Sequence, residues 1–423
     1  ILPTLCSIVA CREPMNGPSR QFATLSPAER WTALTLNVGT VSSAALLVAG
    51  LVWMIASGRT GETAPASGWH VIGYAAAGSF AGFVGAILGV GGGFFAVPFL
   101  VLGMGLNFHQ AAAASIASVV ATSSAAAPHS LRRGFANLHM GLALKTTAVV
   151  GAVAGSYVMA RLGQEHENLL SRLFSILVLA GAYFLWRRAH EQFESPPHDE
   201  ELGTMGKSYF DTARGEQVSY RVKRVPAALV ISVVGGAASS LGLGGGTVNV
   251  PVVRLLCGAP MRVATTTSNY LMGAVAATAA FVKYCEGDLV PAVAVPLTLG
   301  TLAGSRLGAW AGRFLRGRWL QYAFVVIMVV VAGRMLLGVG KQAADTARQV
   351  FAVCPPWTHV LRLFINGQWS SLPSAGMLLL IFTPMLGLVA SLAGALAQRA
   401  WLLTMTAGAA IVVLVFSILL TCL

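Results

Sequence analysis

Long apolar segments separated by shorter polar ones make up most of the 423-residue chain. An α-helix that crosses the hydrocarbon of a bilayer needs about 20 apolar residues, and several segments reach that length. No segment alternates apolar and polar residues as a strand would, so the pattern predicts an all-α polytopic membrane protein. The apolar segments are 31–57, 70–88, 94–105, 108–127, 140–160, 168–187, 225–241, 247–258, 262–283, 288–310, 319–340, 372–397 and 400–423.

The two middle groups of apolar segments carry the same motif. The sequence Gly-Val-Gly-Gly-Gly at 89–93 precedes Pro98, and Gly-Leu-Gly-Gly-Gly at 242–246 precedes Pro251 at the same spacing. The offset of 153 residues that aligns the glycines also aligns Ser115 with Ser268. The chain therefore contains two copies of one unit of roughly 115 residues, an arrangement found in many secondary transporters.

The repeat and two longer polar intervals, 188–224 and 341–371, divide the chain into five predicted parts. The first part contains Arg20-Gln21-Phe22-Ala23, which is similar to a mitochondrial presequence cleavage site. The parts are an N-terminal arm with an extra transmembrane helix at 1–66, transporter repeat 1 at 67–190, a polar loop at 191–224, transporter repeat 2 at 225–340, and a connector with a C-terminal transmembrane hairpin at 341–423.

A glycine cluster interrupts the segment that opens each copy. Each glycine lowers helix stability by about 1 kcal/mol relative to alanine, so four in five positions predict a broken helix. If each broken segment returns as a re-entrant hairpin, the two copies are inverted; if it crosses once with a kink, they are parallel. Inverted copies place most of the 28 lysines and arginines on one side, whereas parallel copies divide them almost evenly. Because lysine and arginine concentrate on the cytoplasmic side, we expect inverted repeats.

Composition narrows the protein class further. Only 10% of the residues are charged, against about 25% in soluble domains, and the mean hydropathy is +0.71. Water-soluble enzymes, disordered proteins and disulfide scaffolds are therefore excluded. The net charge of +13 must lie outside the hydrocarbon, so it reports topology and does not indicate nucleic acid. The six cysteines form no Cys-x-x-Cys pair, so the sequence predicts no zinc site.

Backbone amides at the two breaks are candidate anion ligands. A helix that begins after a break offers unpaired N–H groups and a partial positive charge, which suit a small oxyanion. The alternative is that the glycines only let helices pack closely. No strand precedes either cluster and no Lys-Ser or Lys-Thr follows, so a nucleotide-binding motif is excluded. The candidate amides belong to Gly91, Gly92, Gly93, Phe94, Gly244, Gly245, Gly246 and Thr247.

Hydroxyl and amide side chains after each break are further candidates. They offer neutral donors to an anion without the cost of burying a charge. The alternative is that they satisfy helix backbone or bridge helices, as Ser and Thr often do in membranes. The candidates are Ser115 in the first copy, and Asn249, Thr267, Ser268 and Asn269 in the second.

Acidic residues are scarce in the apolar segments. No Asp or Glu lies in the middle of one, because Glu286 and Asp288 fall in a loop. The sequence therefore offers no buried carboxylate for proton or sodium coupling. The histidines His109, His129 and His139 lie near predicted helix ends, where we expect solvated positions. No metal site, cofactor site or catalytic residue is predicted.

The doubled glycine motif resembles the TauE/SafE sulfite-exporter family of membrane proteins. The resemblance covers about residues 70–340 and is supported by Leu131-Arg132-Arg133-Gly134. The family usually has Ala-Thr-Ser in the helix after the motif; the second copy keeps Thr266-Thr267-Ser268, whereas the first reads Ala113-Ala114-Ser115. The extra N-terminal helix, the 188–224 loop and the C-terminal segments are not needed by a minimal exporter.

The resemblance implies a non-enzymatic permease that exports sulfite, an organosulfonate or a related small anion. The anion would bind between the two breaks, with alternating access produced by the inverted halves. The alternative is a structural or accessory subunit of a larger membrane complex, descended from such a transporter. The expected partners are the lipid bilayer and a small anion, with a homodimer or other subunits left open. The resemblance implies a plasma membrane location, and a mitochondrial inner membrane is the alternative.

Overall fold

The structure is a computed structural model, and helices form most of what it describes. The predicted processing site, the connector 341–371, Gly91 and Gly245 lie outside the described residues. The described residues are 27–57, 68–88, 92–132, 137–162, 167–190, 207–211, 216–220, 225–244, 246–311, 318–337, 372–397, 404–405, 407–412 and 415.

The helical fold predicted from the sequence is confirmed. Five described helices are long and apolar enough to cross a membrane: Glu29–Val52, Phe108–Pro128, Met140–Leu162, Val225–Leu243 and Leu372–Ala397. The helices, in chain order, are α3 (Pro27–Ser57), α4 (Gly68–Leu88), α5 (Gly93–Pro98), η2 (Phe99–Gly103), α6 (Phe108–Arg132), α7 (Leu138–Leu162), α8 (Glu167–His190), α9 (Val225–Ala238), η4 (Ser239–Leu243), α10 (Gly246–Pro251), η5 (Val252–Leu256), α11 (Met261–Cys285), α12 (Pro291–Ala311), α13 (Arg318–Leu336) and α16 (Leu372–Ala397).

The expectation that the chain has no strand is wrong in the polar loop. There β1 (Lys207–Asp211) and β2 (Glu216–Tyr220) form an antiparallel pair, in which Tyr209 lies opposite Val218. Each strand has five residues, too few to stand out as an alternating pattern in a polar stretch. The two strands pair their backbone groups with each other and leave their outer edges open. Such an open sheet can form in a segment that lies outside the hydrocarbon.

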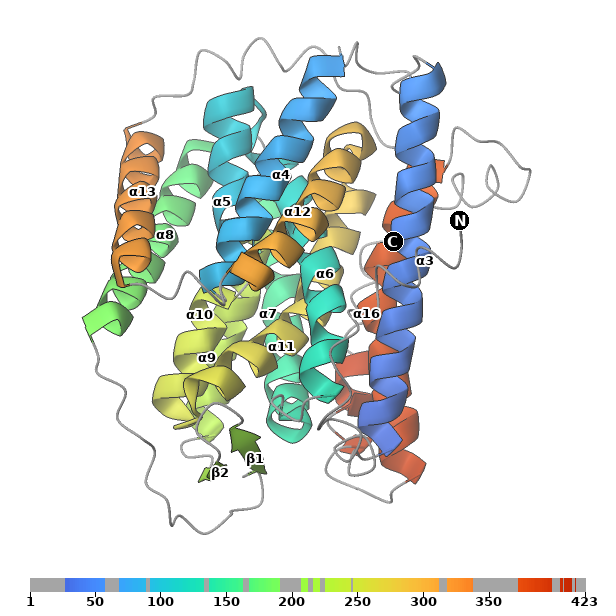
Figure 1. Ribbon diagram of the computed structural model, residues 1–423, viewed down its shortest axis with the longest axis vertical. Coiled ribbons are helices and arrows are strands. Elements are labelled where there is room, and N and C mark those ends of the chain that lie inside the picture. The colour runs from blue at the N-terminus through green and yellow to red at the C-terminus, as the bar shows by residue number, and fades with distance from the viewer. Residues whose placement is uncertain are drawn as a thin grey trace.

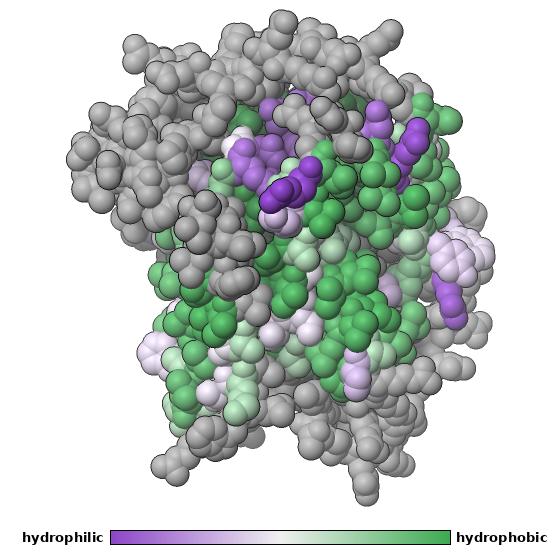
Figure 2. All heavy atoms as spheres, turned by 180° about the vertical axis from the view of Figure 1, so that it is seen from behind, coloured by the Kyte–Doolittle hydropathy of each residue, from purple (hydrophilic) through white to green (hydrophobic). Residues whose placement is uncertain are grey.

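Apolar side chains cover much of the outer surface of the bundle. Trp31, Val230 and Leu337 are among the large hydrophobic side chains that lie more than half exposed. Figure 2 shows hydrophobic side chains over most of the described surface on one face, with hydrophilic ones gathered toward its upper end. Contiguous apolar surface on this scale is expected where the contacting medium is lipid.

The two repeats exchange contacts through their opening helices. Helix α4 of the first copy packs along α12 of the second, and α9 of the second packs along α7 of the first. Glycines allow these close approaches: a Cβ atom at Gly304 would lie 2.0 Å from the carbonyl oxygen of Ser79, and one at Gly236 would lie 1.8 Å from that of Ala148. Small residues serve in the same way at many membrane helix interfaces.

Each opening segment is broken as the glycine clusters predict. In both copies a six-residue α-helix follows the cluster and changes to a π-helix directly after its proline, at Pro98 and at Pro251. Proline lacks an N–H and its ring crowds the carbonyl four residues earlier, which favours a wider helical turn. In Figure 1 the first broken pair, α4 and α5, lies in the upper half, and the second, α9 and α10, lies in the lower half.

The added helices α3 and α16 pack on one another and against the repeats. They contact α6 and α12, and α16 also contacts α11. The hydroxyls of Thr32 on α3 and Ser391 on α16 lie 2.8 Å apart, and Ser391 lies 3.2 Å from the hydroxyl of Tyr270 on α11. These three side chains link the added helices to α11.

Candidate functional site

The two helix breaks meet inside the bundle. The Ser115 hydroxyl on α6 lies 3.1 Å from the carbonyl oxygen of Gly93 and 2.8 Å from that of Gly242, so its single proton is shared between the two breaks. A Cβ atom at Gly93 would lie 2.6 Å from the Gly242 carbonyl oxygen. We call this contact of Gly93, Ser115 and Gly242 the break junction. The two glycine clusters therefore face each other, although they are far apart in sequence.

The second break depends on a backbone conformation that favours glycine. Gly242 has a φ of +97° and Gly244 a φ of +69°, both in the left-handed region. A side chain at Gly242 would also meet Val97 and Ala112 of the first copy. Both the conformation and the close contact therefore require glycine at this position.

The predicted amide ligands lie partly in this buried region. Gly92, Gly93, Phe94, Gly244 and Gly246 are buried. Gly91 and Gly245 lie outside the described residues, and so does the Thr247 side chain. At the first break, the carbonyl of Gly92 accepts from the N–H groups of Phe95 and Ala96, so the short helix α5 begins at once.

Two predicted side-chain ligands are buried without a partner. Both polar atoms of the Asn249 amide on α10 lack a hydrogen bond among the described residues, and so does the Ser268 hydroxyl on α11. Their exposed fractions are 2% and 0%. An unmet buried polar group costs about 1–3 kcal/mol, so these atoms are suited to a ligand or an ordered water. Helices α10 and α11 are in contact directly after the second break.

The other predicted side chains have structural environments. The backbone N–H of Asn137 donates to the Thr267 hydroxyl at 3.0 Å, and the Asn137 side chain accepts from the Met140 N–H at 3.2 Å. Thr267 thus helps to hold the first turn of α7. Asn269 is half-buried. Among the predicted hydroxyl ligands, Ser115 and Thr267 therefore form hydrogen bonds with backbone groups, as the alternative to anion binding predicts.

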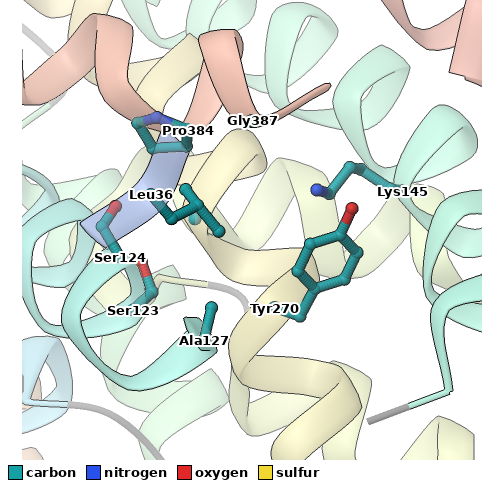
Figure 3. Close-up of a pocket in the computed structure, with 9 residues that line it drawn as sticks. Leu36, Ser123, Ser124, Ala127, Lys145, Tyr270, Pro384 and Gly387 are labelled. Atoms are coloured by element: carbon teal, nitrogen blue, oxygen red, sulfur yellow. The ribbon is translucent and has the colours of Figure 1, made fainter. Parts of the chain in front are cut away.

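Lys145 is a buried cation that the sequence analysis missed. Its side chain is 2% exposed, in the second turn of α7, and its Nζ lies 3.7 Å from the centroid of the Tyr270 ring. Lys145 lines a small cavity, where Ser124 also has a buried hydroxyl without a partner (Figure 3). The sequence signal was present: one lysine stands inside the apolar run that forms α7.

Burial of Lys145 is costly in this setting. The effective penalty for a buried ion is several kcal/mol, and a desolvated cation–π contact returns about 2 kcal/mol. Lysine inside a membrane bundle normally pairs with a carboxylate or lines a polar path. No such ion pair is found for Lys145 among the described residues. Among the described residues, the contact found for the Lys145 ammonium is therefore the face of the Tyr270 ring.

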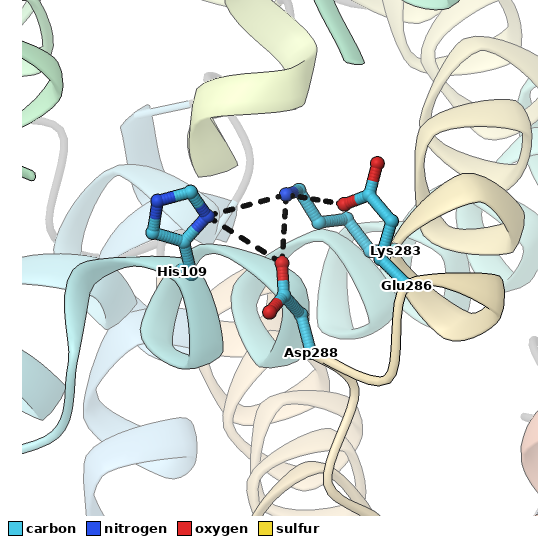
Figure 4. Close-up of polar contacts among 4 residues, drawn as sticks. All are labelled: His109, Lys283, Glu286 and Asp288. Carbon is cyan, nitrogen blue, oxygen red and sulfur yellow. Dashed lines mark hydrogen bonds and ion pairs between the residues drawn. The ribbon is translucent and has the colours of Figure 1, made fainter. Parts of the chain in front are cut away.

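A second polar cluster lies where α11 ends, and it corrects the expectation for His109. His109 is 5% exposed, and its Nδ1 lies 3.5 Å from Asp288 Oδ2. The Lys283 ammonium, fully buried, donates to Glu286 and Asp288 at 2.8 Å each (Figure 4). His109 lies near a helix end, as predicted. The expectation that it is solvated is wrong, because the α11–α12 loop folds over the start of α6. The side chains of His129 and His139 lie outside the described residues.

The two carboxyl groups of this cluster have opposite pKa shifts. Burial raises the pKa of Glu286, and the nearby Lys283 charge only partly offsets that effect. Burial also acts to raise the pKa of Asp288, but hydrogen bonding with His109 and the charge of Lys283 outweigh it, so the net pKa is lowered. Asp288 is therefore the stronger acid of the pair.

Comparison with known proteins identifies the family to which the central part of the chain belongs. The family model "Sulfite exporter TauE/SafE" matches residues 74–335. A second family model, "Protein of unknown function (DUF1634)", matches residues 317–419. The chain is similar to "Probable membrane transporter protein YunE" of Bacillus subtilis (strain 168), with 23% identity over 266 residues, which cover 61% of this chain and 94% of that protein. No solved structure matches this chain. Because the first model covers more than half of the chain, the protein belongs to the TauE/SafE sulfite exporter family of multi-span membrane transporters.

Proposed function

We propose that this protein exports a small sulfur-containing anion, such as sulfite or an organosulfonate, by alternating access between two inverted repeats. The observation that carries the proposal is the pair of unpartnered buried groups, Asn249 and Ser268, on the helices that follow the second break. Neutral amide and hydroxyl donors, together with backbone N–H groups, can hold an anion without burying a permanent countercharge at that point.

The packing of the repeats supports their inversion. Under the sequence repeat, α4 corresponds to α9 and α12 corresponds to α7, so the α4–α12 contact has its counterpart in the α9–α7 contact. The pairs α6–α11 and α8–α13 join corresponding helices directly. A two-fold relation produces contacts of both kinds. In Figure 1 the broken pair α4 and α5 lies in the upper half and the broken pair α9 and α10 in the lower half. This arrangement agrees with a two-fold axis that lies in the membrane plane.

Charge supports the direction of transport. Lysines and arginines are expected on the cytoplasmic side of a membrane. The proposal therefore places the N-terminal arm and the 188–224 loop on the cytoplasmic side of a plasma membrane. An inside-negative potential favours export of each negative charge by about 2.3 kcal/mol per 100 mV. The carboxylates Glu286 and Asp288 lie beyond the end of α11 and contact Lys283. We therefore propose export driven by the membrane potential, without a coupled cation.

The accessory-subunit alternative draws no separate support from the added helices. Helices α3 and α16 contact each other, α6 and α12, so part of their apolar surface is already covered within the chain. The first repeat keeps Ser115 at the break junction, although it has Ala114 where the family usually has a threonine. Both features fit a transporter that carries an added unit.

Flux measurements in proteoliposomes test the proposal. Wild-type protein is expected to release entrapped sulfite or sulfoacetate, faster with an inside-negative potential and independently of a proton gradient. Asn249→Leu removes the amide with little change in size, and about a tenfold loss of flux is expected if it removes one anion contact of about 1.4 kcal/mol. Ser305→Ala is the control, because the Ser305 hydroxyl donates only to Leu302 of its own helix. Absence of flux of either anion by the wild-type protein, with or without gradients, would contradict the proposal.

A further inference from the structure

A cluster of ionic side chains joins the two repeats at one end of the bundle. His109 stands at the start of α6 in the first repeat, whereas Lys283 and Asp288 belong to the second repeat, at the end of α11 and just beyond it. The Nδ1 atom of His109 lies 3.5 Å from Asp288 Oδ2 and 3.5 Å from Lys283 Nζ, and these two groups lie 2.8 Å apart (Figure 4). The His109 Nε2 atom is buried without a partner among the described residues. The polar contacts found for this imidazole therefore run to the other repeat.

The backbone after α11 fixes the position of the Asp288 carboxylate. Gly287 has a φ of +81°, in the left-handed region, and its N–H donates to the carbonyl of Tyr284. The N–H of Asp288 donates to the carbonyl of Lys283, so the two bonds form the Schellman motif that ends many helices. The motif turns the chain back at the end of α11. The backbone itself thus brings Asp288 close to Lys283 and His109.

The link between the repeats can open without leaving a buried charge unpaired. The Lys283 ammonium is fully buried, and a buried ion is costly unless it stays paired. Its two carboxylate partners, Glu286 and Asp288, lie on the same repeat and have side chains that are 20% and 19% exposed, so water reaches them. Separation of His109 from Asp288 would leave both lysine pairs intact. The contact between the repeats is therefore the one that can break at low cost.

The sequence repeat does not provide the same contact at the other end of the bundle. The offset of 153 residues aligns Gly134, beyond the end of α6, with Gly287 beyond the end of α11. The residues at the positions equivalent to His109, Lys283, Glu286 and Asp288 are Arg262, Ser130, Arg133 and Phe135. Two arginines, a serine and a phenylalanine cannot form these ion pairs with one another. The ionic link is therefore specific to one end.

We infer that the contact of His109 with Asp288 and Lys283 is a one-sided lock, which keeps this end of the bundle closed and separates when the end opens. The inference rests on the proposed alternating access for the opening motion. A contact that is made in one state and absent in the other shifts the population toward the state that makes it. The proposed orientation places the lock at the end opposite the 188–224 loop. The lock therefore closes the exterior end, and an exporter at rest does not admit anions from outside.

Cysteine accessibility of the purified full-length protein in lipid nanodiscs tests the lock without any transport. Ala113 is fully buried on α6, one helical turn beyond His109 on the same face. Ala264 is fully buried in the first turn of α11, at the other end of the bundle. Each is replaced by cysteine in a protein whose six native cysteines are replaced by alanine. His109→Leu should speed modification of the Ala113→Cys reporter by a water-soluble maleimide at least about fivefold, and should not speed that of Ala264→Cys.

Glu286→Gln is the matched control, because the Glu286 carboxylate pairs with Lys283 of its own repeat. It should leave the modification rates of both reporters as they are with the native Glu286. An unchanged rate at Ala113→Cys in the His109→Leu protein would overturn the lock. An equal rise at both reporters would overturn it too, because His109 would then stabilise the whole fold and not one end.

Hydrogen exchange gives the same comparison in a protein that keeps its native cysteines. Amide protection falls where a structure opens locally, so His109→Leu should speed exchange in the first turns of α6 and leave the first turns of α11 unchanged. Sulfite flux in proteoliposomes separates the lock from the proposed function. Wild-type flux together with accessibility that ignores His109 contradicts the lock alone, whereas one-sided opening in His109→Leu without wild-type flux contradicts the proposed export function alone.

Discussion

The Ser115 hydroxyl lies 2.8 Å from the carbonyl oxygen of Gly242, a residue 127 positions further along the chain. The same hydroxyl lies 3.1 Å from the carbonyl oxygen of Gly93 in its own repeat. Helix breaks expose carbonyl groups that have no helical partner, and inside a membrane protein these groups must be satisfied locally. A single serine therefore joins the two repeats at the point where both are broken.

Ser115→Ala is expected to lower the free energy of unfolding by about 1–3 kcal/mol, because the carbonyl groups at the two breaks lose the one hydroxyl proton that they share. Chemical or thermal unfolding in detergent measures this loss. Ser118→Ala is the matched control, since its hydroxyl, equally buried, donates only to Ser115 of the same helix. An equal loss of unfolding free energy in the two variants would show that the contact of Ser115 with the two breaks does not stabilise the fold more than a hydrogen bond within one helix.

Gly304→Ala is expected to separate α4 from α12. The added methyl would lie 2.0 Å from the backbone oxygen of Ser79, and a backbone atom cannot rotate away. Overpacking of this kind costs about 1–3 kcal/mol, so the Tm should fall. Gly333→Ala on α13 has no atom within 4 Å of the new methyl and should be neutral or mildly stabilising. A Gly304→Ala protein as stable as wild type would refute the tight packing of these helices.

A double-mutant cycle tests the contact between Tyr270 and Ser391. Tyr270→Phe keeps the ring below Lys145 and removes the hydroxyl, which lies 3.2 Å from Ser391. We expect each of Tyr270→Phe and Ser391→Ala to lower stability, with a coupling energy of about 0.5–1.5 kcal/mol between them. Thermal unfolding of the four proteins gives this value. Strict additivity would mean that the added helix α16 is not held by this bond.

Asp288→Asn should destabilise the protein over most of the pH range. The pKa of Asp288 in the folded state is below its usual value of 3.8, so its contribution is complete above that pH and is lost as the pH falls through the folded pKa. The expected loss is about 1–3 kcal/mol, constant between about pH 5 and 8, and smaller near pH 3. Tm values of wild type and variant across this range provide the measurement. A loss that changes steeply between pH 5 and 8 would contradict the lowered pKa.

Glu286→Gln should behave differently despite the same distance to Lys283. The pKa of Glu286 is raised above its usual value of 4.5, so the folded state holds this proton more tightly than the unfolded state. That stabilising effect is present at low pH and is lost as the pH rises through the folded pKa. The neutral variant should therefore be as stable as wild type, or more stable, at pH 7. A loss as large as that of Asp288→Asn would refute the assignment of the two shifts.

The glycine motif predicted the two helix breaks, whereas the polar pattern did not predict which side chains would lack a partner. Four glycines in five positions weaken a helix whatever surrounds them, so the two breaks could be located from local chemistry alone. The assignment of Ser115 and Thr267 could not, because a hydroxyl can satisfy backbone or bind a ligand, and its sequence position does not reveal which. The hairpin at β1 and β2 was missed because each strand is short and polar.

Lys145 and His109 show where the sequence reasoning stopped. The lysine was visible inside an apolar run, but its ammonium lies against the ring of Tyr270, and the cavity beside it is walled by residues of α3 and α16. His109 was placed near a helix end correctly, whereas its contact with Asp288 needs a loop 179 residues later to return to it. Long-range contacts of this kind leave no local pattern.

The sequence by itself determined that this is a helical membrane protein with two copies of a glycine-broken unit, because hydropathy and glycine content act locally through the backbone. Tertiary structure decided which polar groups remain without partners. The Ser115 hydroxyl lies within hydrogen-bond distance of carbonyl groups at both breaks, while Asn249, Ser268 and Ser124 stay unpartnered among the described residues. Hydrogen-bond satisfaction depends on the position of every neighbouring helix, so only the assembled bundle could decide which of these polar groups have a partner.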